Sequence, residues 1–190
     1  LQQHYRNSVE HPAEPILKAF GNIQQKDAVL TWDGYPELQF EMRDGVAVQV
    51  YPNARRPDWP AAEFIVGNPP FIGNKRMNDQ LSEPYVRALR GAWVDVPESA
   101  DFVMYWWAKT ADLASTRHIK RFGLVTTNSI TMAFNRAVIE ERLRSKRPIS
   151  LVYAVPDHPW TEGDATAAVR IAITVGAAGD FAGTVQSVAN

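Results

Sequence analysis

The chain has 190 residues and a hydrophobic fraction of 45%, which suits one domain with a real core and argues against global disorder. It contains no cysteine, which excludes disulfides and thiolate metal sites and favours a reducing, cytoplasmic setting. No apolar run is long enough to span a bilayer, and the first residues do not resemble a signal peptide. The formal net charge of −1 shows no basic excess of the kind that many phosphate contacts need, so it argues neither for nor against nucleic acid.

The hydrophobic pattern predicts strands that alternate with helices. A short helix is predicted around Pro15–Phe20 in a polar N-terminal part. A hairpin is predicted within residues 33–60, because Asp44-Gly45 separates two runs of alternating apolar residues. The other predicted strands are Lys26–Trp32, Glu63–Gly67, Phe122–Thr127, Ile149–Val155 and Thr166–Val175. The predicted helices are Asn78–Gly91, Ser99–Ser115 and Ser129–Lys146.

This order of elements indicates an α/β fold with a partial, doubly wound and mostly parallel sheet. The last two predicted strands have no helix between them, so we expect an antiparallel strand at one edge. Phe122–Thr127 has the composition of a strand that is buried on both faces. Ligands of such sheets bind at the carboxyl ends of the strands, and Asn68 and Asn128 each follow such an end.

The tetrapeptide Asn68-Pro69-Pro70-Phe71 directly follows a predicted strand, and two prolines cannot continue a central strand. The amine of adenine is a poor nucleophile, because its lone pair is delocalised into the ring. The side-chain carbonyl of Asn68 and the backbone carbonyl of Pro69 can accept both amine hydrogens and draw the nitrogen towards tetrahedral geometry. The prolines fix the turn, and Phe71 offers a face for a base. Asn68, Pro69, Pro70 and Phe71 are therefore the candidate catalytic residues.

The same tetrapeptide resembles the catalytic motif of class I amino-methyltransferases, which use S-adenosylmethionine. Further segments resemble the MmeI-like branch, single-chain restriction-modification enzymes that modify adenine in DNA. These segments are Asp27–Leu30, Phe64–Gly67, Ile72–Arg76, Ser99–Asp101, Tyr105-Trp106, Gly123–Ile130, Pro159-Trp160 and Ala167–Arg170. The resemblance implies methylation of adenine N6 in DNA by base flipping and direct methyl transfer.

The resemblance also implies roles for residues outside the tetrapeptide. Asp27 matches the acidic residue that contacts the adenine of the cofactor, and Trp160 matches an aromatic residue that faces the flipped base. Lys75 and Arg76 follow the motif and are candidate phosphate contacts, while Asn128 is a candidate contact to the nucleic acid. The four histidines show no metal-ligand spacing, so no metal site is predicted.

One part of the family pattern is missing from this sequence. The glycine-rich loop that holds the methionine part of the cofactor is expected two strands before Asp27, and residues 1–24 contain no such loop. We therefore expect residues 1–190 to form one domain that is the C-terminal, catalytic part of a methyltransferase domain. Its partners are then DNA, an N-terminal cofactor-binding segment and a target-recognition domain, and the isolated chain is expected to be inactive.

Other interpretations of the same residues stay open. The acceptor pair also suits a protein glutamine amide, an RNA base or cytosine N4, and a truncated fold can act as a non-catalytic scaffold. Asn-Pro-Pro occurs in ordinary turns, and Asp27 can simply end a strand. Trp160 can be a core residue, and Asp101 can serve the dipole of the helix that follows it.

Overall fold

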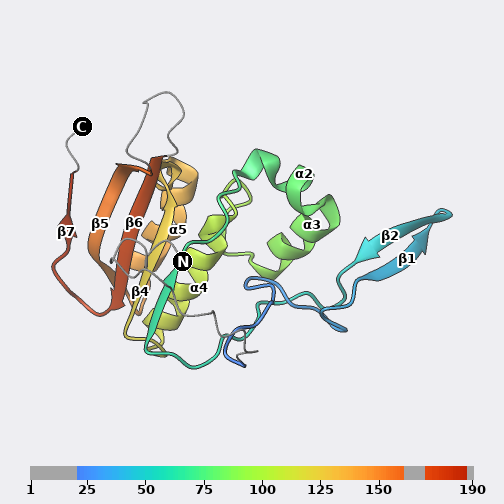
Figure 1. The fold of residues 1–190 in the computed structure, drawn as a ribbon, viewed down its shortest axis with the longest axis horizontal. Coiled ribbons are helices and arrows are strands. Elements are labelled where there is room, and N and C mark those ends of the chain that lie inside the picture. The colour runs from blue at the N-terminus through green and yellow to red at the C-terminus, as the bar shows by residue number, and fades with distance from the viewer. Residues whose placement is uncertain (1–20, 161–169, 188–190) are drawn as a thin grey trace, which may run out of the picture.

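The computed structural model describes residues 21–160 and 170–187 and contains a five-stranded sheet and a separate hairpin (Figure 1). The sheet order is β3-β4-β6-β5-β7. The bounds are β3 (Phe64–Gly67), β4 (Arg121–Thr127), β5 (Ile149–Pro159), β6 (Arg170–Ala178) and β7 (Thr184–Val185). β6 pairs antiparallel with β4 and β5, whereas the pairs β3-β4 and β5-β7 are parallel. The predicted fold class is confirmed, but β6 lies inside the sheet instead of at its edge.

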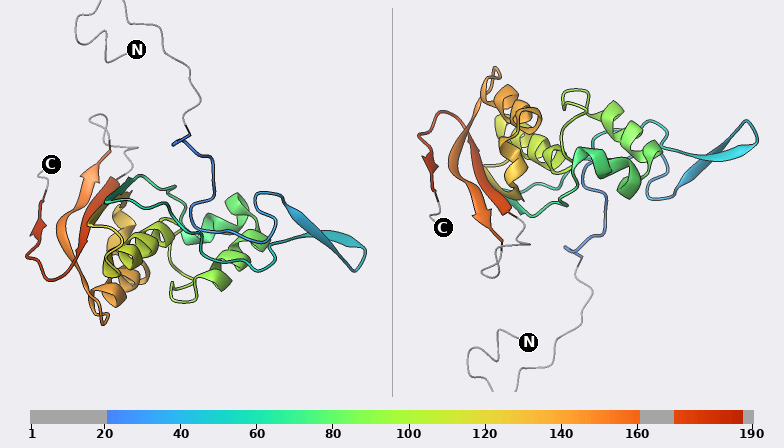
Figure 2. Two further views of the ribbon diagram at one scale, coloured as in Figure 1. Left: turned by 90° about the horizontal axis from the view of Figure 1, so that it is seen from below. Right: turned by 90° about the horizontal axis from the view of Figure 1, so that it is seen from above.

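Helices α4 (Val103–Ser115) and α5 (Ala133–Leu143) pack on each other and on one face of the sheet (Figure 2). Along β4 the side chains alternate, with Phe122, Leu124 and Thr126 buried towards the helices. The ring of Trp107 from α4 stands edge-on to Phe122 at 5.6 Å between centroids. The prediction that this strand is buried on both faces is wrong for the described residues, because no described helix covers the second face.

The predicted helix Asn78–Gly91 is interrupted. The chain forms a short turn, η1 (Asn74–Arg76), and two helices, α2 (Met77–Leu81) and α3 (Glu83–Ala92). The break lies at Ser82, whose φ of 74° is incompatible with a right-handed helix. Pro84 follows in the first turn of α3, where a missing N–H costs nothing. The predicted helix Ser129–Lys146 likewise begins as a turn, η2 (Asn128–Thr131), and continues as α5.

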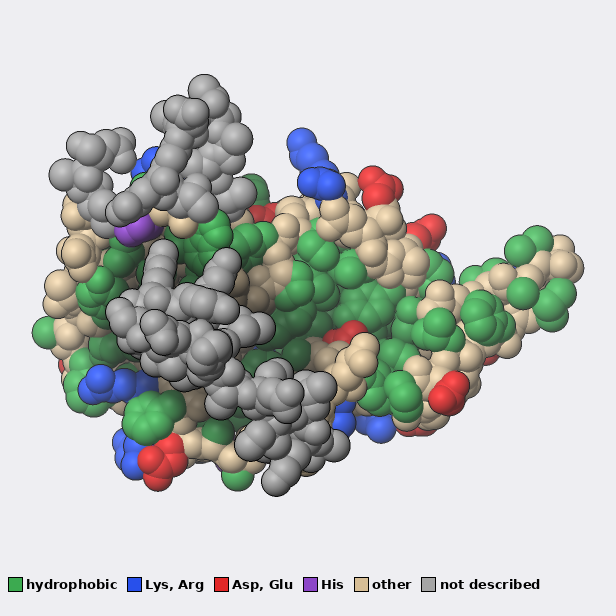
Figure 3. Space-filling view, viewed as in Figure 1, with side chains coloured by type: hydrophobic (Ala, Val, Ile, Leu, Met, Phe, Trp, Pro, Cys, Tyr) green, Lys and Arg blue, Asp and Glu red, His purple; other side chains and the backbone are tan. Residues whose placement is uncertain are grey.

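The predicted hairpin is present and consists of β1 (Gln39–Arg43) and β2 (Val46–Val50). Its two-residue turn holds Asp44 at φ 52° and Gly45 at φ 78°, the positive values that a type I′ turn requires. The hairpin projects from the body of the molecule, and hydrophobic side chains lie along it (Figure 3). Phe40 and Met42 are 60% and 69% exposed.

The predicted strand Lys26–Trp32 is wrong. The Asp27 carboxylate accepts hydrogen bonds from the N–H groups of Val29 and Leu30, both at 2.9 Å, so the chain turns back on itself. Thr31 forms only an isolated bridge with Arg55. The predicted helix Pro15–Phe20 and the first four residues of the predicted strand Thr166–Val175 lie outside the described residues.

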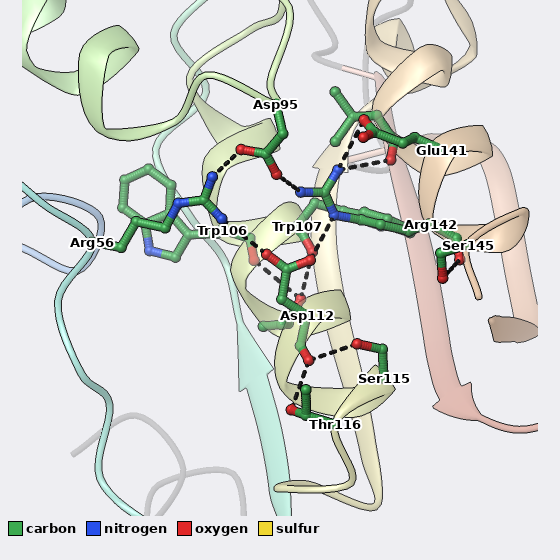
Figure 4. Close-up of polar contacts among 12 residues, drawn as sticks. Arg56, Asp95, Trp106, Trp107, Asp112, Ser115, Thr116, Glu141, Arg142 and Ser145 are labelled. Atoms are coloured by element: carbon green, nitrogen blue, oxygen red, sulfur yellow. Dashed lines mark hydrogen bonds and ion pairs between the residues drawn. The ribbon is translucent and has the colours of Figure 1, made fainter. Parts of the chain in front are cut away.

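A network of two arginines and two aspartates joins the loop after the hairpin to the helices (Figure 4). Arg142 of α5 contacts Asp95 at 2.7 Å and Asp112 at 3.1 Å. Arg56 pairs with the same two carboxylates and lies over the ring of Trp93, 4.1 Å from its centroid. This network fixes the segment that leads into β3, and β3 in turn positions the candidate site.

No helix in the described ranges combines the length and the apolar character that crossing a bilayer requires.

Candidate functional site

Three of the residues singled out in the sequence lie at one edge of the sheet. Strands β3, β4 and β5 run in the same direction, so their carboxyl ends share an edge. Asn68 follows β3, Asn128 follows β4 and Trp160 follows β5. Residues that are far apart in the sequence therefore lie at the same edge of the sheet, the edge formed by the carboxyl ends of these strands. Ligands of α/β sheets bind at this edge.

The tetrapeptide is held against the core by its second residue. Pro69 is buried, whereas Asn68 and Pro70 are exposed and Phe71 is 36% exposed. Gly67 just before it lies close to the neighbouring strand, because a Cβ there would make a tight contact of 3.2 Å with the side chain of Leu124. Within the described part of the chain, the Asn68 side chain and the Pro69 carbonyl have no hydrogen-bond partner. Both acceptors are thus available to a ligand amine.

The loop that continues from the tetrapeptide is tied to the start of α4. The N–H of Asn74 donates to the Asp101 carboxylate at 2.9 Å, and the N–H of Phe102 donates to the carbonyl of Ile72 at 2.9 Å. The other oxygen of Asp101 accepts from the Ser129 hydroxyl at 2.7 Å and from the Asn135 amide at 2.8 Å.

The sequence interpretation gave none of Asp101, Ser129 and Asn135 a role in the candidate site. Asn135 was missed because it is 0% exposed, and the sequence does not reveal that a lone polar residue on a helix is buried. Asp101 and Ser129 carried two sequence signals. Both lie in segments that resemble the family, Ser99–Asp101 and Gly123–Ile130, and both stand near the starts of predicted helices, a position that ordinary capping explains equally well.

Asn128 contributes to a charged group at the same edge. Its side-chain amide donates to Asp157 at 3.4 Å, and Arg170 donates to the same carboxylate at 2.5 Å. The hydrogen bond from Arg170 holds the pKa of the Asp157 carboxyl below its ordinary value. Asn128 remains exposed, as its predicted role requires, but its amide is already oriented by Asp157.

Asp27 lies in a turn, and most of its acceptor capacity is used inside the protein. One oxygen binds the two N–H groups of its turn, and the other accepts from the Tyr85 hydroxyl at 2.7 Å. Burial, followed by the nearby Asp27 charge, raises the pKa of Tyr85 far above its ordinary value, so the phenol stays protonated and donates. Three hydrogen bonds leave about one of the four acceptor positions of a carboxylate free.

The remaining predicted residues lie on the surface. Lys75 and Arg76 are exposed in η1, and neither forms an ion pair with a carboxylate in residues 21–160 or 170–187. Trp160 is 50% exposed and directly follows β5, as the last residue of the described range 21–160. It is therefore not a core residue within the described structure.

Several concave surfaces of the described residues lie away from this edge. One lies at the opposite edge of the sheet and is lined in part by Arg117, Arg147 and Asp180. It contains no residue of the tetrapeptide, and α/β sheets bind their ligands at the carboxyl edge, so we do not place the site there. The described residues contain no cluster of three or more His, Cys, Asp or Glu side chains that could hold a metal ion.

Comparison with known proteins gives a family for most of the chain. The family described as "MmeI, DNA-methyltransferase domain" matches residues 2–185. A solved structure titled "Structure of Type IIL restriction-modification enzyme MmeI in complex with DNA has implications for engineering of new specificities" is similar, with 24% sequence identity and a TM-score of 0.49. The similarity covers 66% of this chain and 17% of that chain, so this chain spans a minor part of that protein. None of the curated proteins matches. The chain belongs to the MmeI DNA-methyltransferase domain family.

Proposed function

We propose that this chain carries the substrate side of a methyltransferase site that methylates adenine N6 in DNA, as part of a restriction-modification protein. Membership of the family over residues 2–185 supports a DNA methyltransferase. The observation that carries the proposal is the pair of available acceptors, the Asn68 side chain and the Pro69 carbonyl, at the carboxyl edge of the sheet.

The chemistry follows from these two acceptors. Hydrogen bonds from the amine of an extruded adenine to Asn68 and Pro69 localise the nitrogen lone pair and aim it away from the base plane. Both acceptors stand on a backbone that the prolines and the buried ring of Pro69 hold rigid, so little reorganisation is needed at the moment of transfer. No covalent intermediate with the protein is required.

S-adenosylmethionine supplies the activated methyl group when it is bound. Asp27 fits a role towards its adenine, because the carboxylate is partly buried and keeps one acceptor position that can take an exocyclic amine. The phenol of Tyr85 fixes the orientation of that carboxylate, and the turn at Val29 and Leu30 fixes its place in the backbone.

Surface residues around the loop suit a nucleic acid. Phe71 and Trp160 are partly exposed aromatic residues that follow β3 and β5, and stacking on such side chains is worth about 1–3 kcal/mol per base. That gain offsets part of the few kcal/mol that base flipping costs. Lys75 and Arg76 are exposed next to the loop and can neutralise phosphates, and Asn128 presents a polar side chain at the same edge.

The proposal is tested by substituting Asn68 in the full-length protein that contains this chain. Asn68→Ala removes one of the two acceptors at an exposed position, so folding should be unchanged. We expect the rate of methyl transfer to fall about 100-fold or more, the size of effect seen when a preorganised polar group is removed from an active site. Asn78→Ala is the matched control, because Asn78 is an equally exposed asparagine on α2. Full activity of Asn68→Ala would refute the proposal.

The substrate is tested separately from the catalytic residue. Labelled methyl transfer from S-adenosylmethionine is measured with amplified DNA, total RNA and a protein extract, and the modified nucleoside is identified by mass spectrometry. N6-methyladenine in DNA is the expected product. If the product is instead N4-methylcytosine, a methylated RNA base or methylated glutamine, the proposed substrate is wrong, but the proposed role of Asn68 stays.

A further inference from the structure

Asp101 binds the loop of the candidate site instead of capping the helix that it precedes. It stands two residues before α4 and is 9% exposed, but its carboxylate makes no hydrogen bond to the N–H groups of that helix. The three hydrogen bonds to the carboxylate come from the Asn74 N–H, the Ser129 hydroxyl and the Asn135 amide. The interpretation of Asp101 as a simple dipole residue therefore does not account for its contacts.

The segment that carries Asn68 is held at two points. Upstream, β3 pairs in parallel with β4, and Gly67 lies opposite Leu124. Downstream, the carbonyl of Ile72 and the N–H of Asn74 are bound by consecutive residues, Phe102 and Asp101. The tetrapeptide spans the short distance between these two attachments, so a shift of the downstream one moves the Asn68 side chain.

The downstream attachment is itself rigid. The amide oxygen of Asn135 accepts from the N–H of Asp101 at 2.9 Å, and its amide nitrogen donates to the carbonyl of Ser129 at 3.0 Å. The Ser129 hydroxyl lies 2.5 Å from that of Thr127, the last residue of β4. Asp101 thus connects the loop of Asn68 to the carboxyl end of the neighbouring strand, where Asn128 begins η2.

The chemistry of this group makes Asp101 hard to replace. A carboxylate can accept from three donors at once, whereas an asparagine has one acceptor oxygen and must turn its NH2 either towards the Asn74 N–H or towards the donors of Ser129 and Asn135. A buried donor left without an acceptor destabilises the arrangement that contains it. When the NH2 faces the Asn74 N–H, the loop relieves that destabilisation by moving away from the start of α4.

We propose that Asp101 is a positioning residue that holds the Asn68 loop in the geometry needed for methyl transfer. This inference rests on the proposed function of Asn68. Asp101 contacts neither the acceptors nor the substrate in this scheme, so it acts through Ile72 and Asn74. Its removal is expected to slow the chemical step and to leave DNA affinity nearly unchanged.

The test compares Asp101→Asn with Asp79→Asn in the full-length protein. Asp79 is an exposed carboxylate on α2 with no ion pair in the described residues, so its substitution controls for the loss of one charge near the loop. Single-turnover methyl transfer is measured with saturating S-adenosylmethionine and amplified DNA, together with the Kd for DNA. Hydrogen exchange of residues 68–76 and of α4 is followed by mass spectrometry.

For Asp101→Asn we expect a rate about 10- to 100-fold lower, because a misplacement of about 1 Å can cost that much. The Kd for DNA should change less than about threefold, and faster exchange should be confined to residues 68–76, including the Asn74 amide. A rate within about twofold of the unsubstituted protein would overturn the proposal. So would faster exchange throughout α4 and the sheet, which would mark a general loss of stability.

The comparison also separates this inference from the proposed function. If Asn68→Ala is inactive and Asp101→Asn is fully active, only the positioning role fails. If Asn68→Ala is fully active, the proposed function fails, and the positioning role fails with it.

Discussion

Replacing Arg142 by Met should destabilise the packing of α4 and α5 much more than the loss of a surface ion pair does. The Arg142 side chain is 7% exposed, and its guanidinium contacts Asp112 at 3.1 Å, Asp95 at 2.7 Å and the Val138 carbonyl at 3.2 Å. Methionine fills a similar volume but donates no hydrogen bond. The substitution therefore leaves Asp95 and Asp112 facing a single remaining cation, Arg56.

The magnitude follows from burial and from that remaining cation. Removing one partner of a buried ion pair costs about 3–5 kcal/mol. The Asp95 and Asp112 side chains are 29% and 40% exposed and so keep part of their hydration, and Arg56 still neutralises one charge. We therefore expect the free energy of local unfolding of α4 and α5 to fall by about half of that cost, roughly 2 kcal/mol. This makes the equilibrium constant for local opening about 30 times larger.

Hydrogen exchange measures this locally, even within a longer protein. Peptides from α4 and α5 should exchange about 30-fold faster in Arg142→Met. Arg136→Met is the matched control, because Arg136 forms an exposed pair with Glu140 on the same helix, and such pairs are worth about 0.3–0.5 kcal/mol. Burial raises the pKa of Asp112, so adding Asp112→Asn to Arg142→Met should recover part of the loss. Equal exchange in the two single variants would refute the assigned weight of the network.

Two further outcomes are expected from other parts of the sheet. Gly176→Ala should lower the thermal stability by about 1–3 kcal/mol, because its Cβ would lie 2.3 Å from the ring of the buried Phe122. Gly123→Ala should be tolerated, since its Cβ would meet a single methyl group at 3.8 Å. Equal melting temperatures for Gly176→Ala and Gly123→Ala would contradict this reasoning. In a carboxyl NMR titration, Arg170→Gln should raise the pKa of Asp157, which the Arg170 hydrogen bond holds below 3.8. The stability from that pair is present above pH 3.8 and is lost as the pH falls through the lowered pKa, so an unchanged titration would show that the pair does not form.

Features set by neighbouring residues could be predicted from the sequence. Asp44-Gly45 specifies its hairpin because both residues tolerate a positive φ, and the structure has both there. The stop of β3 at Asn68 was also predictable, because prolines cannot donate to a sheet ladder. The placement of Asn68 and Asn128 at one edge then followed from the parallel direction of their strands.

Features set by distant contacts could not be predicted. Lys26–Trp32 has the composition of a strand, but the Asp27 side chain supplies the acceptor for its own turn, and the buried phenol of Tyr85 holds that side chain. Ser82 breaks a segment that is helical by composition, and nothing local to Ser82 reveals its φ of 74°. The role of Asp101 depends on Asn135, whose burial arises only when α5 packs on α4.

The internal position of β6 affects the spacing between strand ends at the carboxyl edge. Adjacent strands lie about 4.8 Å apart, so β3 and β5, which β4 and β6 separate, lie about 14 Å apart. At the carboxyl edge this spacing separates the end of β3, which Asn68 follows, from the end of β5, which Trp160 follows. Had β6 stood at the edge, β5 would pair with β4 and this gap would be one strand narrower. The antiparallel strand β6 thus widens the spacing between the strand ends that precede Asn68 and Trp160.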